Sequence, residues 1–171
     1  MKKLCCSYFW SHFAALICLT GCSVVAPVNP GDSDAQVISK LGRPTARYQD
    51  GGQQLLEYRH GPAGQQTYMA RIGADGRLMS YEQVLTMQKF GTIRVGEATK
   101  ADVLRSVGQP AEVSTLTLPQ LEVWSYRYKE NNVWNSMMHV HFDKSGIVRL
   151  LQNGPDPRYE EHDRSSDGGR R

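Results

Sequence analysis

The feature that most constrains the fold is a segment that occurs twice. Residues 33–44 (SDAQVISKLGRP) match residues 99–110 (TKADVLRSVGQP) at a constant offset of 66 positions. Each copy begins with a hydroxyl side chain that can cap a helix, spaces its apolar residues along one helical face, and ends in Gly-x-Pro. In the first copy Gln36 follows Ser33 by three positions, as in a capping box. Because glycine suits a helix end and proline prevents continuation, both segments predict a short helix, and their recurrence predicts two copies of one folding unit.

The residues after each predicted helix have the β-rich and alternating patterns that are typical of strands. Turn signals at residues 75–76 and 144–146 separate them. The predicted strands are 55–58, 68–72 and 77–79 after the first helix, and 123–126, 138–142 and 147–151 after the second. A further helix is predicted over residues 86–93. The expected fold class is α+β, a tandem repeat of short helices packed on antiparallel meander sheets of about three strands each.

A family resemblance rests on this order of elements. A helix ending in Gly-x-Pro, an aromatic strand such as Trp124-Ser-Tyr126, and then a strand, a turn and a strand resemble the SmpA/OmlA-type (BamE-like) small outer-membrane lipoproteins. The doubled form also resembles the tandem architecture of the β-lactamase inhibitory protein. The resemblance covers residues 30–153, in two copies. It implies a role in outer-membrane assembly or envelope integrity through protein–protein interaction.

The amino terminus is typical of a secretory signal. Lys2 and Lys3 precede an apolar stretch, residues 4–19, that is interrupted by polar side chains and is shorter than the about 20 apolar residues of a membrane span. It ends in an aliphatic residue, two small residues and Cys22, which is similar to the lipobox of bacterial lipoprotein precursors. That resemblance implies cleavage before Cys22 and lipidation of its thiol. Each buried methylene contributes about 0.8 kcal/mol, so two or three acyl chains would form a lasting membrane anchor.

Lipidation of Cys22 sets the expected organisation of the chain. The other three cysteines lie in the signal, so the mature chain is expected to have no disulfide, no thiolate metal site and no cysteine nucleophile. Ser23 implies, by the sorting rule for lipoproteins, an outer-membrane, periplasm-facing location, or a cytoplasmic-membrane anchor if the host has a single membrane. The predicted segments are a signal peptide (1–21), a tether (22–30), a first helix-plus-meander repeat (31–85), a second (86–155) and a disordered tail (156–171).

Charge and motifs exclude several function classes. The formal charge of +3 falls to +1 when Lys2 and Lys3 leave with the signal, so the dense basic footprint of a nucleic-acid-binding protein is missing. The sequence has no recognisable Ser/His/Asp arrangement, no phosphate-binding glycine loop and no paired carboxylates in an apolar run. We therefore expect a protein that is not an enzyme and that uses no cofactor or metal.

Strand alternation divides the side chains between a helix-covered face and an open face. The side chains assigned to the core are Leu56, Tyr58, Ala70, Ile72, Trp124, Tyr126, Val140 and Phe142. Those assigned to the open face are Glu57, Arg59, Met69, Arg71, Arg127, Met137, His139, His141 and Arg149. In a tandem sheet the open face would form a concave, mildly basic platform for an acidic protein segment or a lipid head group. The alternative is an ordinary solvated sheet face.

Six residues are candidates for partner binding: Arg71, Arg127, Trp134, His139, His141 and Arg149. His139 and His141 share a strand face, but two histidines are only half a metal site, and their main expected contribution is pH sensitivity. Trp134 lies in an Asn-rich stretch predicted to be a hairpin loop. There it would be an interface anchor if exposed, or would fold back over the hairpin.

The sequence thus predicts a membrane-anchored lipoprotein that acts by contact with an envelope or outer-membrane protein. Two alternatives stay open. The tandem architecture also suits an inhibitor that covers an enzyme's active site with its concave face, which requires a projecting loop. A convergent polar pocket would instead indicate a small-ligand or lipid-binding lipoprotein, or an enzyme.

Overall fold

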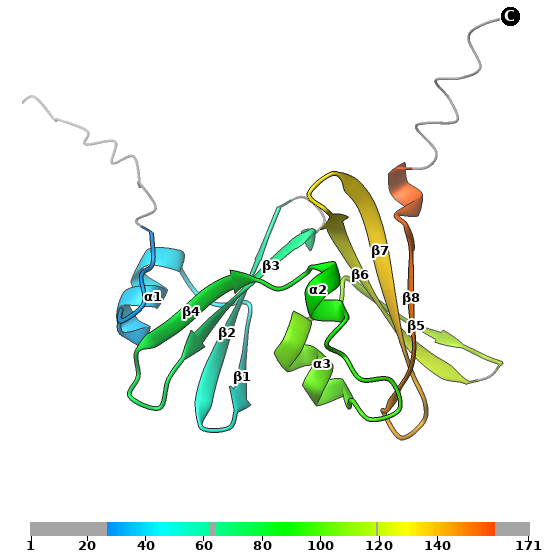
Figure 1. The fold of residues 1–171 in the computed structure, drawn as a ribbon, viewed down its shortest axis with the longest axis horizontal. Coiled ribbons are helices and arrows are strands. Elements are labelled where there is room, and N and C mark those ends of the chain that lie inside the picture. The colour runs from blue at the N-terminus through cyan, green and yellow to red at the C-terminus, as the bar shows by residue number, and fades with distance from the viewer. Residues whose placement is uncertain (1–26, 62–63, 119, 160–171) are drawn as a thin grey trace, which may run out of the picture.

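The computed structural model describes residues 27–61, 64–118 and 120–159. The predicted signal peptide, Cys22 and residues 160–171 lie outside the described residues. The described chain is an α+β protein with two four-stranded antiparallel sheets and a few short helices (Figure 1), which confirms the predicted fold class at this level. None of the helices in these ranges has the length and apolar character that crossing a membrane requires.

The first helix, α1 (Asp34–Leu41), forms where its sequence predicts it. The Ser33 hydroxyl accepts a hydrogen bond from the Gln36 N–H, and the Gln36 side chain accepts one from the Ser33 N–H, which completes the predicted capping box. Gly42 ends the helix with a φ of 83°, a conformation that favours glycine. Val37 is fully buried against the sheet that follows.

The helix α3 (Lys100–Val107) is built in the same way. The Thr99 hydroxyl accepts from the Asp102 N–H, and the Asp102 carboxylate accepts from the Thr99 N–H at 2.8 Å. Gly108 ends the helix with a φ of 80°. Both helices therefore have the ends that their shared sequence pattern predicts.

The two sheets are meanders in which each strand pairs with its neighbours in the chain. The first sheet comprises β1 (Ala46–Asp50), β2 (Gln53–His60), β3 (Gln66–Ile72) and β4 (Leu78–Gln83). The second comprises β5 (Glu112–Leu116), β6 (Leu121–Glu130), β7 (Trp134–Phe142) and β8 (Val148–Pro155). The strands β1 and β5 were not predicted, because they are short edge strands whose side chains are mostly exposed and give no apolar alternation.

A third helix, α2 (Met87–Phe90), is a single turn and is shorter than the helix predicted over residues 86–93. The Thr86 hydroxyl caps it by accepting a hydrogen bond from the Lys89 N–H, and Gly91 ends it. Its one fully buried side chain, Phe90, points into the core of the second half of the chain.

Helices and sheets stack as alternating layers (Figure 1). The helix α1 covers one face of the first sheet, and α2 and α3 lie between the first sheet and the second. The other face of the second sheet is not covered by any element of the described ranges.

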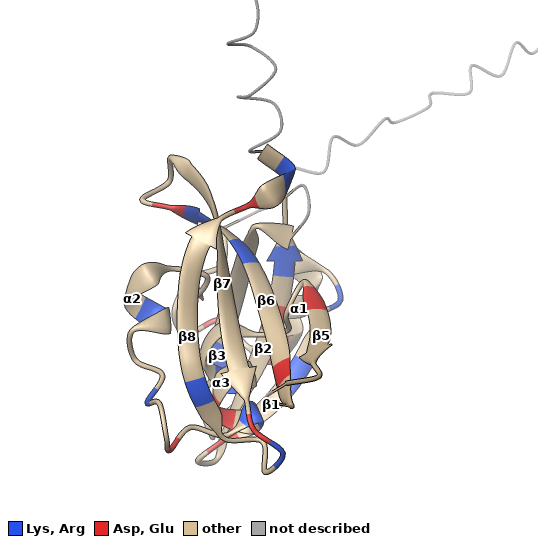
Figure 2. Cartoon of the chain, turned by 90° about the vertical axis from the view of Figure 1, so that its right-hand side faces the viewer, with Lys and Arg blue, Asp and Glu red and all other residues tan. Residues whose placement is uncertain are grey.

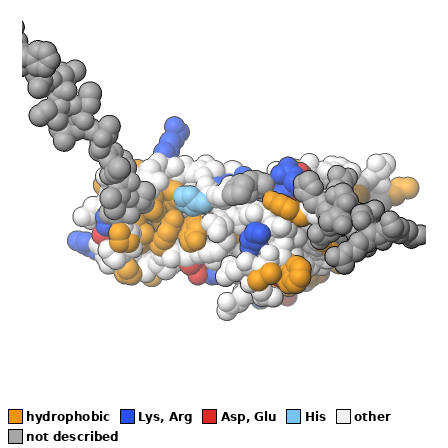
Figure 3. Space-filling view, turned by 90° about the horizontal axis from the view of Figure 1, so that it is seen from above, with side chains coloured by type: hydrophobic (Ala, Val, Ile, Leu, Met, Phe, Trp, Pro, Cys, Tyr) orange, Lys and Arg blue, Asp and Glu red, His pale blue; other side chains and the backbone are white. Residues whose placement is uncertain are grey.

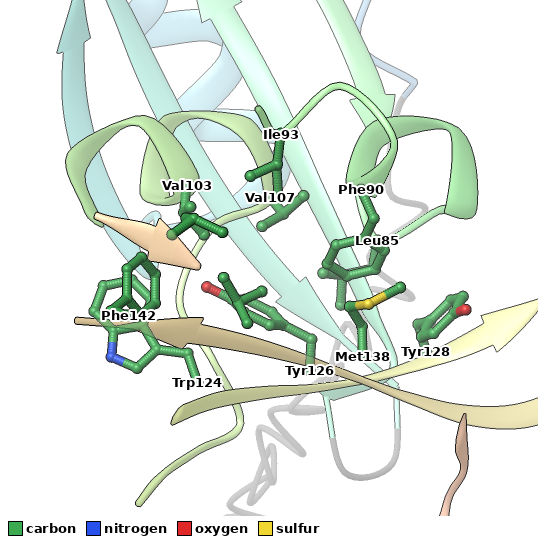
Figure 4. Packing of buried hydrophobic residues seen from close by; sticks show 12 residues of the cluster. Leu85, Phe90, Ile93, Val103, Val107, Trp124, Tyr126, Tyr128, Met138 and Phe142 are labelled. Atoms are coloured by element: carbon green, nitrogen blue, oxygen red, sulfur yellow. The ribbon is translucent and has the colours of Figure 1, made fainter. Parts of the chain in front are cut away.

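The core between α2, α3 and the second sheet is rich in aromatic side chains (Figure 4). Phe90 packs edge-to-face on Tyr126 and Tyr128, with ring centroids 5.7 and 5.3 Å apart. Trp124 packs on Phe142 with centroids 4.7 Å apart. All eight side chains that the sequence assigns to the core are buried, so that prediction is confirmed.

The prediction of an open face is wrong for the first sheet. Glu57 and Met69 are 0% and 2% exposed, because α3 and the turn after it pack on that face. The backbone of Gly108 lies so close that a Cβ there would be 2.8 Å from the Glu57 carboxyl carbon, and the Gln109 N–H donates to both Glu57 oxygens at 3.1 and 3.2 Å. The two sheets therefore do not form one continuous platform.

Candidate functional site

The uncovered face of the second sheet, which is turned toward the viewer in Figure 2, carries a hollow. Two rows of partnered residues cross its four strands. The middle row is Glu112, Ser125, His139 and Gln152, and the adjacent row is Ser114, Val123, His141 and Leu150. The hollow has a volume of about 580 Å³. All the residues of the two rows except Leu150 line it, together with Leu116, Arg127, Met137, Asp156, Pro157 and Arg158.

Arg127 lies at one end of the hollow and is 5% exposed. Its Nη2 donates to Oε1 of Glu112, and its Nε lies 3.4 Å from Oδ2 of Asp156. This guanidinium holds the pKa of Glu112 below its usual range. Asp156 is itself fully buried, and its N–H donates to the Asn135 carbonyl oxygen at 2.9 Å. Asp156, the first residue after the boundary predicted at residue 155, is thus packed against the second sheet.

His139 lies at the centre of the middle row. Its Nδ1 is 2.8 Å from the Ser125 Oγ on the neighbouring strand. Burial lowers the pKa of His139, an effect that the nearby Glu112 carboxylate opposes. The imidazole is therefore favoured in its neutral form, in which one ring nitrogen donates and the other accepts.

His141 is 7% exposed, and neither of its ring nitrogens has a hydrogen-bond partner among the described residues. Burial lowers its pKa, and the proximity of His139 lowers it further. A neutral imidazole offers one donor and one acceptor, and each buried polar atom without a partner costs about 1–3 kcal/mol. His141 is thus a polar side chain on the hollow that lacks the contacts it needs.

The hollow does not carry the basic excess predicted for the open face. Arg127 and Arg158 line it together with Glu112 and Asp156, so these formal charges balance. Both histidines are favoured as neutral rings. The surface therefore offers hydrogen-bonding groups among apolar side chains rather than a field that attracts acidic partners.

The structure brings three of the six candidate residues together: Arg127, His139 and His141 line the hollow. Arg71 lies elsewhere, in a cleft of about 310 Å³ between the first sheet and α3, where its Nη1 is 3.2 Å from Oδ2 of Asp50. Arg149 is outside the hollow, at a bulge, where its guanidinium pairs with Asp143 at 2.6 Å.

Trp134 also lies apart from the hollow. It begins β7 after a turn in which Asn131 and Asn132 have positive φ, and it is 68% exposed. By strand alternation it shares the parity of Met138, which faces the core, and not that of His139. Trp134 is therefore an exposed side chain on a different surface from the histidines.

Sequence reasoning missed several polar residues of the site, among them Ser125, Glu112, Asp156 and Gln152. Ser125 lies two residues before Arg127 on β6, so their side chains share a face of the sheet. The alternation that identified Arg127 therefore applied to Ser125 as well. Glu112 belongs to a strand that was not predicted, and Asp156 to a segment predicted as disordered. Gln152 gave no signal of its own, because its role depends on pairing with His139 across the sheet.

The polar side chains in the hollow supply hydrogen-bond donors and acceptors. Across the described ranges, no group of three or more His, Cys, Asp or Glu side chains is arranged to hold a metal ion. The Ser125–His139 pair has the types of a nucleophile and a base, but such a pair needs a third group that orients the base. Among the described residues, no carboxylate accepts a hydrogen bond from His139.

Comparisons with known proteins identify no family. No protein-family model matches the sequence, and no curated protein matches it. Among solved structures, the chain is similar to the crystal structure of a DUF4309 family protein (YjgB) from Bacillus subtilis. The two are 14% identical, with 73% of this chain and 79% of that chain covered and a TM-score of 0.32. A likeness of this extent assigns no function to the chain.

Proposed function

We propose that this chain is a membrane-anchored lipoprotein that binds a protein partner in the hollow of the second sheet, and that it serves outer-membrane assembly or envelope integrity. The observation that carries the proposal is the burial of His141, without hydrogen-bond partners, on a sheet face that no described element covers. A partner segment lying in the hollow would pair the His141 nitrogens and cover the apolar side chains around them.

The first sheet supports a protein partner. Its corresponding face is filled by α3 and by the turn at Gly108, whose neighbour Gln109 satisfies the buried Glu57 carboxylate. A sheet of this shape thus takes a helix end and a turn on this face within the same molecule. The second sheet has an equally polar centre, and Leu150, at the end of the His141 row, is 46% exposed and available for contact.

The tandem repeat is part of the proposal. Its support is the sequence match at a constant offset, the identical capping of α1 and α3, and the similar φ of Gly42 and Gly108. A further likeness is an isolated bridge from each helix cap to the residue just before a later strand: Ser33 pairs with Arg77, before β4, and Thr99 pairs with Ile147, before β8. Membership of the SmpA/OmlA family is proposed on the order of these elements.

The membrane anchor is proposed on the sequence of the amino terminus, where two lysines, a short apolar stretch and a lipobox-like ending precede Cys22. Cys22→Ala should leave an uncleaved precursor without lipid, which intact-mass measurement of the membrane fraction would show. Normal processing of that variant would refute the anchor and leave the binding proposal standing.

A small ligand is the second candidate for the hollow. Its volume lies within the about 300–1,000 Å³ of ligand sites, and its lining combines apolar side chains with a few polar groups. A ligand with a hydroxyl or amide group would satisfy a neutral His141, since such groups both donate and accept.

Site-specific photo-crosslinking in intact cells separates the two. A benzophenone side chain replaces Gln152, which lines the hollow and is exposed, and in a matched variant it replaces Asp75, in an exposed turn of the first sheet. A discrete protein adduct from position 152 and not from position 75 is expected, and it should weaken when His141→Leu is added. If position 152 gives no adduct at native expression, a protein partner in the hollow is refuted, and a small ligand becomes the leading candidate.

A further inference from the structure

A second surface of the molecule, which shares no lining residue with the hollow, is lined by no charged side chain. It is a groove of about 490 Å³ at the start of the described chain, lined by Pro27, Val28, Leu41, His60, Gln66, Tyr68 and Tyr81. Figure 3 looks down on this side of the molecule and shows hydrophobic side chains gathered beside a histidine. Neither proposed function of the hollow uses this groove.

Aromatic rings form the wall of the groove. Tyr68 and Tyr81 are stacked, with centroids 5.1 Å apart, and His60 meets Tyr68 edge-on at 5.7 Å. Tyr58 supports Tyr81 from the core side at 6.3 Å. Burial and the neighbouring tyrosines raise the pKa of Tyr81 to about 12, so its ring stays neutral. Rigid, neutral rings with an apolar body and one polar tip are the side chains that favour a membrane–water interface.

The groove is also the described surface nearest in the chain to the anchor. Five peptide units join Cys22 to Pro27, which lines the groove, and they span at most about 18 Å when fully extended. If Cys22 is lipidated, the membrane surface therefore lies within that distance of Pro27. The polar region of a bilayer leaflet is about 5–8 Å thick, so the rings can reach the interface without any change of fold.

We infer that the groove formed by Tyr68, Tyr81 and His60 rests on the membrane that carries the lipid anchor. This inference rests on the proposed anchor at Cys22. This contact sets the orientation of the protein relative to the bilayer. The first and last described segments lie on the same side of the molecule in Figure 1, and the face of the second sheet that carries the hollow is turned toward the viewer in Figure 2. In this orientation the hollow stays open to a partner beside the protein.

The test uses the full chain, processed in cells and reconstituted in phosphatidylcholine vesicles. A lipidated Cys22 has no free thiol, and the remaining cysteines lie within residues 1–21, so one engineered cysteine gives a unique labelling site. Gln66→Cys places an environment-sensitive fluorophore at the groove, and Lys144→Cys places it at the exposed β7–β8 turn. Lipids with a nitroxide near the head group should quench the probe at position 66 at least about twofold more than the probe at position 144.

A third variant asks whether the uncharged surface causes the contact. His60 is the exposed cross-strand partner of Gln66, so His60→Glu puts a charge beside the probe. Quenching at position 66 should fall to the level of position 144, with an unchanged melting temperature. Equal quenching at positions 66 and 144 in protein whose mass shows the lipid would overturn the inference alone. Protein without lipid would overturn the anchor itself.

Discussion

The two sheets differ in whether the corresponding face of each is buried. On the first sheet it is buried beneath α3, and on the second it is uncovered in the described chain. Residues at corresponding positions differ accordingly. Glu57 and Met69 on the covered face correspond, at offsets of 68 and 70, to Ser125 and His139 on the open face. The sequence of a strand alone does not determine whether its second face is open, because that depends on whether the element after the sheet packs on the face.

The difference also shows how each face satisfies its buried polar groups. Burial raises the pKa of Glu57. Its carboxyl group is nevertheless satisfied, because it accepts hydrogen bonds from the Tyr48 hydroxyl at 2.6 Å and from the Gln109 N–H. His141 is almost as buried and has no partner among the described residues. The Glu57 carboxylate is therefore satisfied within the molecule, whereas the His141 ring on the open face needs a ligand, a partner or water to be satisfied.

The largest expected effect comes from adding a methyl group at Gly108, where the end of α3 packs closely against the first sheet. Gly42 and Gly108 have nearly equal φ, but a Cβ at Gly42 would meet nothing within 4 Å, whereas one at Gly108 would meet Glu57 and Thr67 at 2.8–3.0 Å. Gly42→Ala should lower the free energy of unfolding by about 1 kcal/mol through backbone strain alone. Gly108→Ala should lower it by about 3 kcal/mol, because overpacking adds to the strain.

Urea denaturation of the two variants measures this difference directly, because each glycine is the control for the other. Equal losses of stability in Gly42→Ala and Gly108→Ala would show that α3 does not press on the first sheet. The comparison between a covered and an open face would then fail at its first step.

The second effect tests the buried carboxylate. Glu57→Ala removes the acceptor of the Tyr48 hydroxyl and of the Gln109 N–H, which should cost about 2 kcal/mol of stability. Glu57→Gln keeps an acceptor and should cost less than about 1 kcal/mol. Ser125→Ala, at the corresponding position of the open face, should also cost less than about 1 kcal/mol, since solvent in the hollow can replace the lost contact.

The pH dependence gives an independent check on Glu57. Its raised pKa means that the folded state holds the proton at pH values where the unfolded chain has lost it. The stability contributed by this group is therefore fully present below about pH 4.5 and declines as the pH rises through the folded pKa. Glu57→Gln should remove this decline. A wild-type and variant difference that does not change with pH would contradict the assignment.

The sequence predicts the parts of the fold that depend on neighbouring residues. The caps Ser33 and Thr99, the helix ends at Gly42 and Gly108, and all eight core side chains follow from short-range pattern. The strands β1 and β5 do not follow from it, because their side chains are exposed and their pairing is set by β2 and β6. Nor does the burial of Glu57, which depends on a turn 52 residues later in the chain.

The candidate site was likewise predictable only as far as short-range pattern along each strand reveals it. Alternation along β6 and β7 places Arg127, His139 and His141 on one face, and the structure brings them together. Arg71 has the same alternation on the first sheet, but there α3 covers the face, and Arg71 lines a separate cleft beside that helix. The partners of Arg127, which are Glu112 and Asp156, come from segments without a periodic signal, so the balance of charge in the hollow was not visible in the sequence.

The smallest expected effect concerns His139 and His141 on the open face. Their contribution to stability depends on pH in the opposite direction from that of Glu57. Burial lowers the pKa of His139 and of His141, so between the folded pKa values and the ordinary value of about 6.5 the unfolded chain binds more protons than the folded protein. The stability contributed by these rings is therefore present above pH 6.5 and is lost as the pH falls. Because both rings lie beside solvent in the hollow, we expect a loss of about 0.5 kcal/mol between pH 7 and pH 5. Denaturation of the wild type and of a His139→Gln/His141→Gln variant at both pH values isolates this term, since His60 and the carboxylates are common to both. If the two proteins change alike, the histidines are not desolvated, and the open face is an ordinary solvated surface.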